Sequence, residues 1–445
     1  MSHPLLHKAP TRCGRTGRRR RRTARSTTMH DHADIIRGRV VKDEPYVKFF
    51  DWLRQHDFPK TKMVLAEFPN TGRGMMATSD IQAGEVIVSV PKAFLMCNET
   101  LQKVYGQHPL SMHQLLALHL CYLKRDPTSW WKPYVDLLPS HFNTMPVQYP
   151  PALAKHLPYY LKEEVAQQAS KLESDYANVN RFIKSRQELG SVGYKEYEWA
   201  WLCVNTRCIH MSTIDATAKG GNIAMAILLD FLNHSWEAKI ESGFNVRTQC
   251  FEIRTLTPYR KGEQVFINYG PHDNLAILRE YGFVIPDNIY NFVSLDQEVW
   301  NLFDEMETVR DARLKKSILE KEGYAGDYSI KKNEISFRLL TALRLLALDG
   351  PGFERRLLDW QQVLSGASEM ISVDNERRVL IMLKSICERT NQVASHEESL
   401  LTTLLTSQQQ SMHPFAIRFL RQIWKETFDI SKLTIQEIDQ KLSEL

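Results

Sequence analysis

The sequence predicts an α+β fold of small antiparallel sheets with a helical insertion, followed by an all-helical C-terminal domain. Three observations support this prediction. A β-branched run from Glu85 to Val90 ends at Pro91, and apolar residues alternate with polar ones again after residue 240. Between these β regions, over about residues 100–207, apolar residues recur at helical spacing. The helical period returns for residues 296–445.

The first half of the chain predicts a short helix, opening strands and then helices. Residues 46–55 place Tyr46, Phe49, Phe50 and Leu53 at helical spacing. Gly72 and Gly74 then mark a turn that leads into the opening strands. Within the helical insertion the clearest helix has one face made of Tyr194, Tyr197, Trp201, Val204 and Cys208.

The second β region predicts three successive antiparallel strands. Phe244 alternates with polar neighbours, as does Ile253, and Thr248-Gln249 makes a plausible hairpin between them. A turn at residues 258–262 leads into the third strand, residues 264–269. Beyond it, a helix at residues 335–348 is stopped by Gly350-Pro351.

Charge divides the chain into a basic tail and an acidic body. The 445 residues carry a net charge of +5, but residues 1–30 hold nine Lys or Arg and no acid, which leaves 48 basic and 52 acidic residues elsewhere. We therefore expect a disordered basic tail at 1–43, a domain at 44–295 that contains the insertion, and a helical substrate-binding domain at 296–445. The folded body is not expected to bind nucleic acid directly.

The run Arg18 to Arg22 predicts a nuclear import signal or an anion-binding tail, and hence a protein of nucleus and cytoplasm. A solvated tail without a targeting function remains an alternative. A mitochondrial transit peptide is a weaker alternative, because five consecutive Arg are incompatible with the amphipathic helix that such peptides form. A third alternative is a nucleic-acid-binding protein that works through residues 12–25.

Cysteine content and hydropathy exclude several classes. Seven Cys without a CxxC pair make neither a disulfide framework nor a zinc cluster, so a reducing compartment and no metal site are expected. Cys203 and Cys208 are most simply core residues. The longest apolar run, residues 223–232, is far shorter than a membrane span and contains Asp230, so no membrane partner is expected.

Common catalytic motifs are absent: there is no GxSxG, P-loop, HExxH or GxGxxG. A dense polar segment, Asp230 to Ser235, instead closes the apolar run, and Phe266-Ile-Asn-Tyr-Gly270 follows about 35 residues later. Such groups need partners when buried. Considered alone, Asp230 to Ser235 is typical of a capped helix end, and Gly72-Arg73-Gly74 is typical of a turn.

Together these pieces resemble the SET-domain methyltransferases, specifically the branch typified by the plant Rubisco large-subunit lysine methyltransferase and the actin histidine methyltransferase. The resemblance covers nearly the whole body and implies the SET fold. It rests on the following segments: Thr71 to Gly74 with the strands to Pro91, Ser129 to Pro139 with its Trp-x-Pro-Tyr pattern, Trp201 to Arg207, Asn233-His234-Ser235, Tyr269-Gly270 and Glu280 to Phe283. The Cys-rich zinc segment that follows many histone-directed SET domains is missing, since only Cys387 lies downstream.

The resemblance implies S-adenosylmethionine as cofactor and a role for each matching residue. The backbone of Thr71, Gly72, Arg73 and Gly74 would hold its methionine part, and Arg207 would meet its charged end. Asp230 is expected near the same pocket, Asn233 would bond the cofactor, and His234 would offer mainly backbone contacts to adenine. Tyr269 would place its hydroxyl beside the transferring methyl as the catalytic residue, and Tyr281 would line the substrate channel.

The implied activity is protein-lysine methylation, on a histone or non-histone protein, by a monomer. Methyl transfer is an in-line displacement that depends on alignment and exclusion of water. In the histidine enzyme an Asn two positions after the Thr-Arg arginine would hold the imidazole, whereas here the corresponding residue is Ile209, which suits the stem of a lysine. Histidine methylation and an inactive SET-fold scaffold remain the alternatives.

Overall fold

The computed structural model describes residues 38–186, 188–211, 223–348, 353–406 and 412–445. The predictions for the basic tail, residues 1–43, lie outside these residues as far as residue 37. For residues 38–43 the expected disorder was wrong, because Arg39–Val40 form strand β1 and pair with β2 (Met63–Phe68). At the start of the described chain, helix α1 (Glu44–Gln55) buries Phe49, Trp52 and Leu53, which confirms the helix predicted from their spacing.

The first sheet has five strands in the order β1-β2-β3-β11-β8. Its neighbours are antiparallel except for β8 and β11, which run parallel, with Asn233 opposite Phe266 and His234 opposite Ile267. The strands are β1 Arg39–Val40, β2 Met63–Phe68, β3 Gly72–Ala77, β8 Asn233–His234 and β11 Gln264–Ile267. The predicted opening strands are thereby confirmed.

Two three-stranded sheets accompany it, in the orders β4-β10-β9 and β5-β7-β6. Their strands are β4 Val86–Pro91, β5 Leu95–Met96, β6 Cys208–His210, β7 Ile223–Ala226, β9 Ile240–Asn245 and β10 Cys250–Thr255. The β9–β10 hairpin is confirmed, with Gln249 at a φ of +55° in its turn. The third predicted strand exists as β11, but its expected place beside the hairpin was wrong, because β11 pairs with β3 and β8 in the first sheet.

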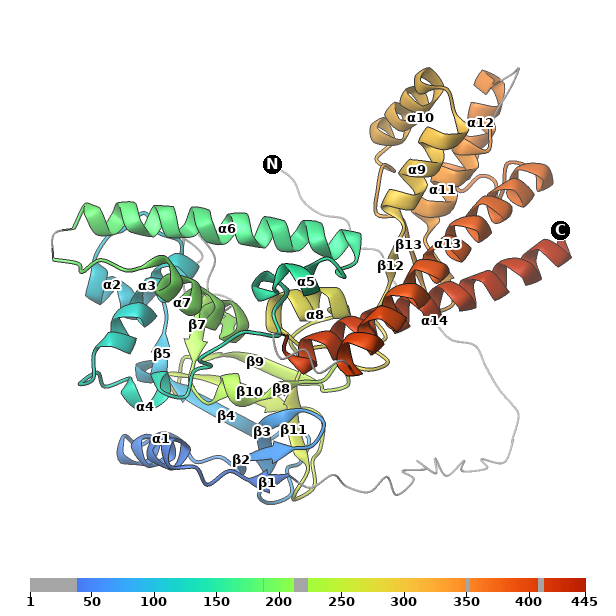
Figure 1. Ribbon diagram of the computed structural model, residues 1–445. Helices are drawn as coiled ribbons and strands as arrows, with labels where there is room; N and C mark the ends of the chain where they lie inside the picture. Colours follow the sequence, from blue (N-terminus) through green and yellow to red (C-terminus); the bar gives the residue numbers. More distant parts are fainter. Residues whose placement is uncertain (1–37, 187, 212–222, 349–352, 407–411) are drawn as a thin grey trace, which may run out of the picture. The chain divides into compact units, whose positions relative to one another are not determined.

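The helical insertion lies between β5 and β6, as predicted (Figure 1). Its helices are α2 Asn98–Tyr105, α3 Met112–Arg125, α4 Lys132–Val135, α5 Pro151–Ala154, α6 Tyr159–Lys184 and α7 Tyr194–Arg207. Ser111 caps α3 by accepting a hydrogen bond from the Gln114 amide. On α7 the predicted face is buried through Tyr197, Trp201 and Val204, and this packing fixes the direction of Arg207 at the helix end. The placement of Cys208 on this helix was wrong, because the chain turns extended there and Cys208 begins β6.

The C-terminal region is helical, as predicted, apart from a small sheet of β12 Val293–Ser294, β13 Ser329–Lys331 and β14 Glu334–Ile335. It follows helix α8 (Asn274–Tyr281). Its helices are α9 Asp296–Met306, α10 Val309–Lys321, α11 Phe337–Leu346, α12 Phe353–Leu364, α13 Val373–Thr406 and α14 Pro414–Glu444. The two long helices α13 and α14 pack along each other (Figure 1).

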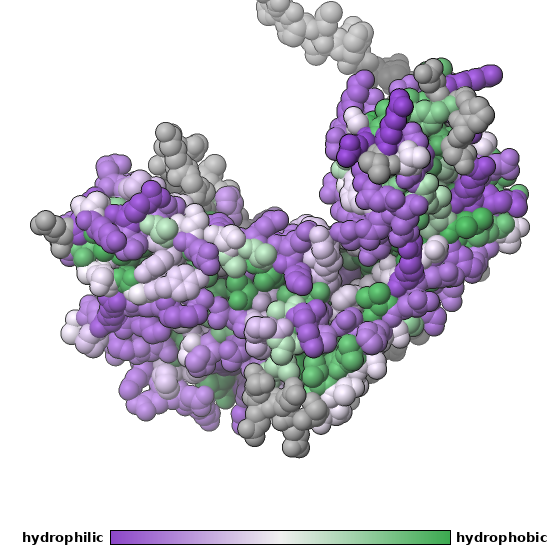
Figure 2. Space-filling model, turned by 45° about the horizontal axis from the view of Figure 1, so that its top comes forward, coloured by the Kyte–Doolittle hydropathy of each residue, from purple (hydrophilic) through white to green (hydrophobic). Residues whose placement is uncertain are grey.

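Three hydrophobic cores hold these elements. The first fills the sheets and the insertion, and the second fills the C-terminal helices. The third joins both regions, because Leu153 and Leu161 of the insertion and Leu278 of α8 pack with Leu420 and Trp424 of α14. On the face drawn in Figure 2, hydrophilic residues predominate and hydrophobic ones form separate patches. None of the described helices has both the length and the hydropathy that a bilayer span requires.

Candidate active site

Parallel pairing of β8 with β11 brings the two polar segments together. Asn233 donates from Nδ2 to the Arg73 carbonyl at 3.0 Å and to Gln264 Oε1 at 2.8 Å. Gln264 donates in turn to Thr71 Oγ1 at 2.6 Å. The segment 71–74, β8 and β11 are therefore tied into one unit.

Two glycines are required in this unit, for different reasons. A Cβ on Gly74 would lie 2.5 Å from Gln264 Oε1 and 2.8 Å from Asn233 Nδ2, so only glycine leaves room for their hydrogen bond. Gly72 has a φ of +69°, a backbone conformation that side chains disfavour. The interpretation of Gly72-Arg73-Gly74 as a turn was wrong. The turn is formed by residues 69–71, and Gly72 to Gly74 begin strand β3, which pairs with β2 and places Gly74 against Asn233.

Tyr269 is held at three points. Its amide donates to His234 Nδ1 at 3.0 Å, its ring stacks on the imidazole at 5.0 Å, and its hydroxyl donates to the Leu232 carbonyl at 2.7 Å. Burial lowers the pKa of His234 to about 4, so the imidazole is neutral at pH 7. Because Nδ1 accepts a hydrogen bond, the imidazole proton lies on Nε2, which is buried without a partner.

Arg207 and Asp230 form a buried ion pair. Arg207 Nη1 lies 2.9 Å from Asp230 Oδ2, and the Tyr134 hydroxyl donates to the same oxygen at 2.8 Å. The Asp230 side chain is 1% exposed and that of Arg207 is 20% exposed. Burial raises the pKa of Asp230, and Arg207 opposes this effect. Arg207 Nε and Asp230 Oδ1 have no partner.

Tyr281 lies next to Tyr269 at the end of α8, with 5.0 Å between their ring centroids. Burial raises the pKa of Tyr281 to about 12, with smaller contributions from Cys208 and Glu280. Burial also raises the pKa of Tyr269, so both phenols stay protonated at neutral pH. Ile209 pairs with Ala224 between β6 and β7, and strand alternation directs its side chain away from that of Cys208.

The residues predicted from the sequence thus fall into three connected groups. Residues 230–234 connect them, because Asp230 binds Arg207, the Leu232 carbonyl and His234 bind Tyr269, and Asn233 binds segment 71–74. The roles assigned to these residues and to Ile209 stay predictions. No cluster of His, Cys, Asp or Glu suited to a metal occurs within the part of the chain that the structure describes.

Two residues of the site were not assigned a role from the sequence. Tyr134 belongs to the quoted Trp-x-Pro-Tyr segment, so a signal was present, but its contact with Asp230 spans 96 positions. Gln264 is part of no recognised motif, and nothing in its neighbourhood marks it as the partner of both Asn233 and Thr71.

Comparison with known proteins identifies the family of the chain. The SET domain family matches residues 72–270, and the Rubisco LSMT substrate-binding family matches residues 308–435. SET domain-containing protein 4 of Mus musculus is 33% identical over 393 residues, which cover 84% of this chain and 86% of that protein. The chain belongs to the SET-domain family. Its order of Asn-Thr-Arg, Leu-Asn-His-Ser and Glu-Tyr-Gly-Phe segments predicts similarity to this animal group, and the similarity is confirmed.

Two further matches are an actin-histidine N-methyltransferase and a solved structure of LSMT. The actin-histidine N-methyltransferase of Danio rerio is 26% identical over 272 residues, which cover 57% of this chain and 45% of that protein. A crystal structure of the SET domain of LSMT bound to lysine and AdoHcy has a TM-score of 0.62 at 17% identity, covering 91% of this chain and 93% of that one. The predicted SET fold is thereby confirmed.

Proposed function

We propose that this chain is an S-adenosylmethionine-dependent protein methyltransferase that modifies lysine. The observation that carries the proposal is the arrangement around residues 230–234, which joins Arg207, Asn233 and Tyr269 in one site. The SET relatives support it, since LSMT is a SET protein seen with AdoHcy and lysine.

The residues present fit the cofactor. Of the ten buried side-chain polar atoms that lack a partner among the described residues, three lie at this site, namely the donors Arg207 Nε and His234 Nε2 and the acceptor Asp230 Oδ1. Orphaned buried groups of this kind are uncommon and point to a ligand. S-adenosylmethionine carries a carboxylate, an ammonium group and a purine. It would therefore offer acceptors to the Arg207 and His234 donors and a donor to Asp230. The left-handed Gly72 would leave the backbone of 71–74 open to close approach.

The bound cofactor supplies an activated methyl group, and the protein must align an acceptor nitrogen with it. Because the Tyr269 hydroxyl gives its proton to the Leu232 carbonyl, its lone pairs remain free to accept a hydrogen bond. An amine N–H directed at that oxygen would turn the nitrogen lone pair toward the methyl carbon. His234 fixes the Tyr269 backbone, and Tyr281 would exclude water from the channel.

Lysine must lose its proton before it attacks, since its ordinary pKa of about 10.4 leaves it charged at neutral pH. The buried aromatic pair Tyr269 and Tyr281 would disfavour the ammonium form and lower that pKa. Histidine is the second candidate, favoured by the actin-histidine relative. Ile209 argues against it, because an apolar side chain leaves an imidazole N–H unpaired at a cost of about 1–3 kcal/mol.

The test is a methyl-transfer assay on cell lysate with labelled cofactor, followed by mass spectrometry of the labelled site. Label on lysine supports the proposal, and label on histidine alone would show that Ile209 was misread. An inactive scaffold would give no label and no heat of cofactor binding in calorimetry.

We also propose that the basic tail directs the protein to the nucleus as well as the cytoplasm. The support is the segregation of nine positive charges within residues 1–30. Replacing Arg18 to Arg22 with Gln in the tagged full chain should shift it toward the cytoplasm, and an unchanged distribution would favour the solvated tail.

A further inference from the structure

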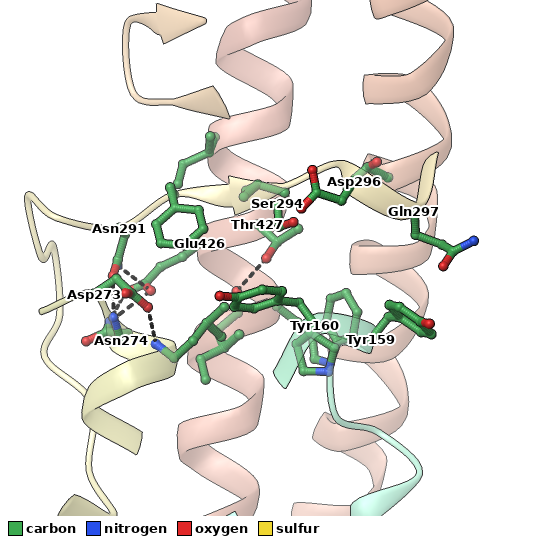
Figure 3. Close-up of a pocket in the computed structure, with 18 of the residues that line it drawn as sticks. Tyr159, Tyr160, Asp273, Asn274, Asn291, Ser294, Asp296, Gln297, Glu426 and Thr427 are labelled. Carbon is green, nitrogen blue, oxygen red and sulfur yellow. Dashed lines mark hydrogen bonds between the residues drawn. The ribbon is translucent and has the colours of Figure 1, made fainter. Parts of the chain in front are cut away.

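A cavity of about 380 Å³ lies apart from the Tyr269 site, between four parts of the chain. The start of α6 contributes Tyr159 and Tyr160, residues 273–300 form a second side, α13 contributes Thr390, and α14 closes the cavity (Figure 3). The volume lies within the range of about 300–1,000 Å³ typical of small ligand sites. Nothing in the proposed methyl transfer uses this space.

The walls of the cavity are rich in aromatic rings. Tyr160 and Phe292 contact each other edge to face at 6.5 Å. Trp424 is fixed because its indole N–H donates to the His156 carbonyl at 2.8 Å. The aromatic lining residues are Tyr159, Tyr160, Phe292, Trp300 and Trp424. Ring faces carry partial negative charge and attract cations.

The charged lining residues are all acidic: Glu163, Asp273, Asp296, Glu298 and Glu426. No Lys, Arg or His lines the cavity among the described residues. Their partners are neutral groups: Asp273 caps α8, Asp296 accepts from the Tyr328 amide at 2.7 Å, and Glu163 accepts from the Tyr159 hydroxyl at 2.6 Å.

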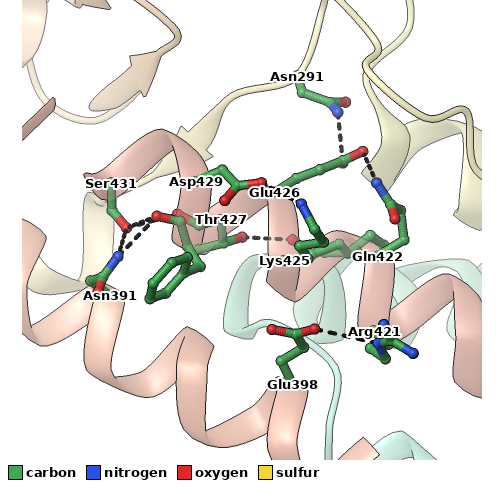
Figure 4. Close-up of polar contacts among 12 residues, drawn as sticks. Asn291, Asn391, Glu398, Arg421, Gln422, Lys425, Glu426, Thr427, Asp429 and Ser431 are labelled. Atoms are coloured by element: carbon green, nitrogen blue, oxygen red, sulfur yellow. Dashed lines mark hydrogen bonds and ion pairs between the residues drawn. The ribbon is translucent and has the colours of Figure 1, made fainter. Parts of the chain in front are cut away.

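Glu426 is a partly buried member of this acidic group. Its carboxylate accepts from Asn291 at 2.7 Å and from Gln422 at 2.9 Å (Figure 4). It also accepts from Asn274 at 2.9 Å (Figure 3). Burial raises the pKa of Glu426 to about 7 and also raises the pKa values of Asp296 and Glu298. The nearby cations Lys425, Arg338 and Arg389 oppose these shifts only weakly. The lining therefore offers carboxylates without a cation among them, and Glu426 is largely ionised only at a pH above about 7.

We propose that this cavity binds a basic side chain, Arg above all, of the acceptor protein at a position other than the methylated residue. The proposal rests on the methyltransferase function proposed above. A guanidinium can stack on the tyrosine and tryptophan rings while its N–H groups bond the carboxylates. The walls thus suit a planar cation better than a neutral or anionic group.

Helix α8 relates this cavity to the Tyr269 site. Asp273 and Asn274 line the cavity at the start of α8, and Tyr281 ends the helix. Eight helical residues span about 12 Å. An extended chain covers about 3.3 Å per residue, so the basic side chain should lie roughly four or more residues from the methylated one.

The chain's own tail could present the same chemistry, since residues 1–30 contain eight Arg and one Lys. We commit to the acceptor protein, because proposed methylation requires a second polypeptide at the neighbouring site. One arm of the experiment distinguishes binding of the tail from binding of the acceptor protein.

The experiment is a titration of the full chain, without cofactor, with the peptide acetyl-Gly-Arg-Gly-amide at pH 8, followed by ligand-observed NMR. The matched probe replaces Arg by the uncharged isostere citrulline. We expect the Arg peptide to bind about tenfold or more tightly than the citrulline peptide. Equal affinity for the Arg and citrulline peptides would overturn the proposal. So would the absence of binding when the Arg peptide is present at about 10 mM. Because no methyl is transferred, the result is independent of the proposed activity.

Three variants locate the binding. Glu426→Gln and Asp296→Asn should each weaken the Arg peptide by about tenfold. Asp296→Asn keeps an oxygen that can accept from the Tyr328 amide, so it tests the site even where Glu426→Gln fails to fold. The control Asp429→Asn removes a charge three residues along α14 that pairs with Lys425 outside the cavity, and it should leave affinity unchanged. An equal loss of peptide affinity in Glu426→Gln, Asp296→Asn and Asp429→Asn would mean that the peptide is attracted by the overall charge of the protein, and it would overturn the site.

The last arm replaces Arg18 to Arg22 with Gln in the full chain. Unchanged peptide affinity supports the acceptor protein as the occupant. A gain of about tenfold would show that the tail competes for the cavity and would overturn that assignment.

Discussion

Replacing Asp230 with Ala should destabilise the protein by about 3 kcal/mol, because two buried groups lose their shared acceptor. Asp230 Oδ2 accepts from Tyr134 at 2.8 Å and from Arg207 at 2.9 Å. Breaking a buried pair by removing one partner costs about 3–5 kcal/mol. The lower end applies here, since the Arg207 side chain remains 20% exposed and water can reach part of it.

A double-mutant cycle isolates the pair from its surroundings. Arg207→Met alone leaves a carboxylate that is 1% exposed without its partner, whereas the double variant Arg207→Met/Asp230→Ala removes both charges. The double variant should therefore be more stable than the sum of the two single changes by about 1–3 kcal/mol. It should nevertheless lose cofactor affinity, if Arg207 has its predicted role at the charged end of S-adenosylmethionine.

Urea unfolding followed by far-UV circular dichroism measures the stability, and calorimetry measures cofactor binding. The exposed pair Lys425–Asp429, with both side chains 50% exposed, supplies the control, and Asp429→Ala should change stability by less than about 1 kcal/mol. Additive effects within about 0.5 kcal/mol would refute the reasoning, because they would show that Arg207 and Asp230 act independently.

Three further predictions concern other residues. Tyr269→Phe should keep the melting temperature within a few degrees but lower turnover by a factor on the order of 100, because the oxygen that would orient the amine is lost; full activity would remove Tyr269 from its role. Asn233→Ala removes the hydrogen bonds to Arg73 and Gln264, so calorimetry should show cofactor affinity lowered by about tenfold or more, and unchanged affinity would contradict the site. Burial raises the pKa of Glu426 from 4.5 to about 7, so its protonated form stabilises the fold below pH 4.5 and this contribution disappears as the pH rises through 7. Between pH 5 and pH 8 the melting temperature of the wild type should therefore fall relative to that of Glu426→Gln. The corresponding loss in the free energy of unfolding is at most about 3 kcal/mol, and a difference in melting temperature that does not change with pH would contradict the pKa shift.

Much of the local structure was predictable, because burial of one face leaves a periodic trace in the sequence. The α7 face and the β9–β10 hairpin follow directly from such periodicity. The small sheet at β13–β14 could not be predicted in the same way, since strands of two or three residues are too short for alternation to be recognised. Asn333, at a φ of +64° in its two-residue turn, was the available signal.

The site was predictable in its residues but not in its connections. Asn233, His234 and Tyr269 follow from the motifs, but their contacts depend on the parallel pairing of β8 with β11, and sequential strands suggested an antiparallel hairpin instead. Gln264 illustrates the limit, because its function comes from lying between Thr71 and Asn233 and not from any pattern around it. Long-range pairing of this kind is decided by tertiary packing.

Helix α8 determines what the proposed cavity can contribute to catalysis. Its start is fixed by the Asp273 cap, and its end is fixed by Gly282, at a φ of +78°, where a Cβ would lie 2.8 Å from Thr144 Oγ1. A helix held at both ends keeps Tyr281 in place whether or not the cavity is filled. Binding a basic residue there should then lower KM without raising kcat, because it stabilises the bound substrate and the transition state equally. Once the acceptor is identified, Asp296→Asn should raise KM by about tenfold at constant kcat, and a variant that lowers kcat instead would show that cavity occupancy is transmitted to Tyr281.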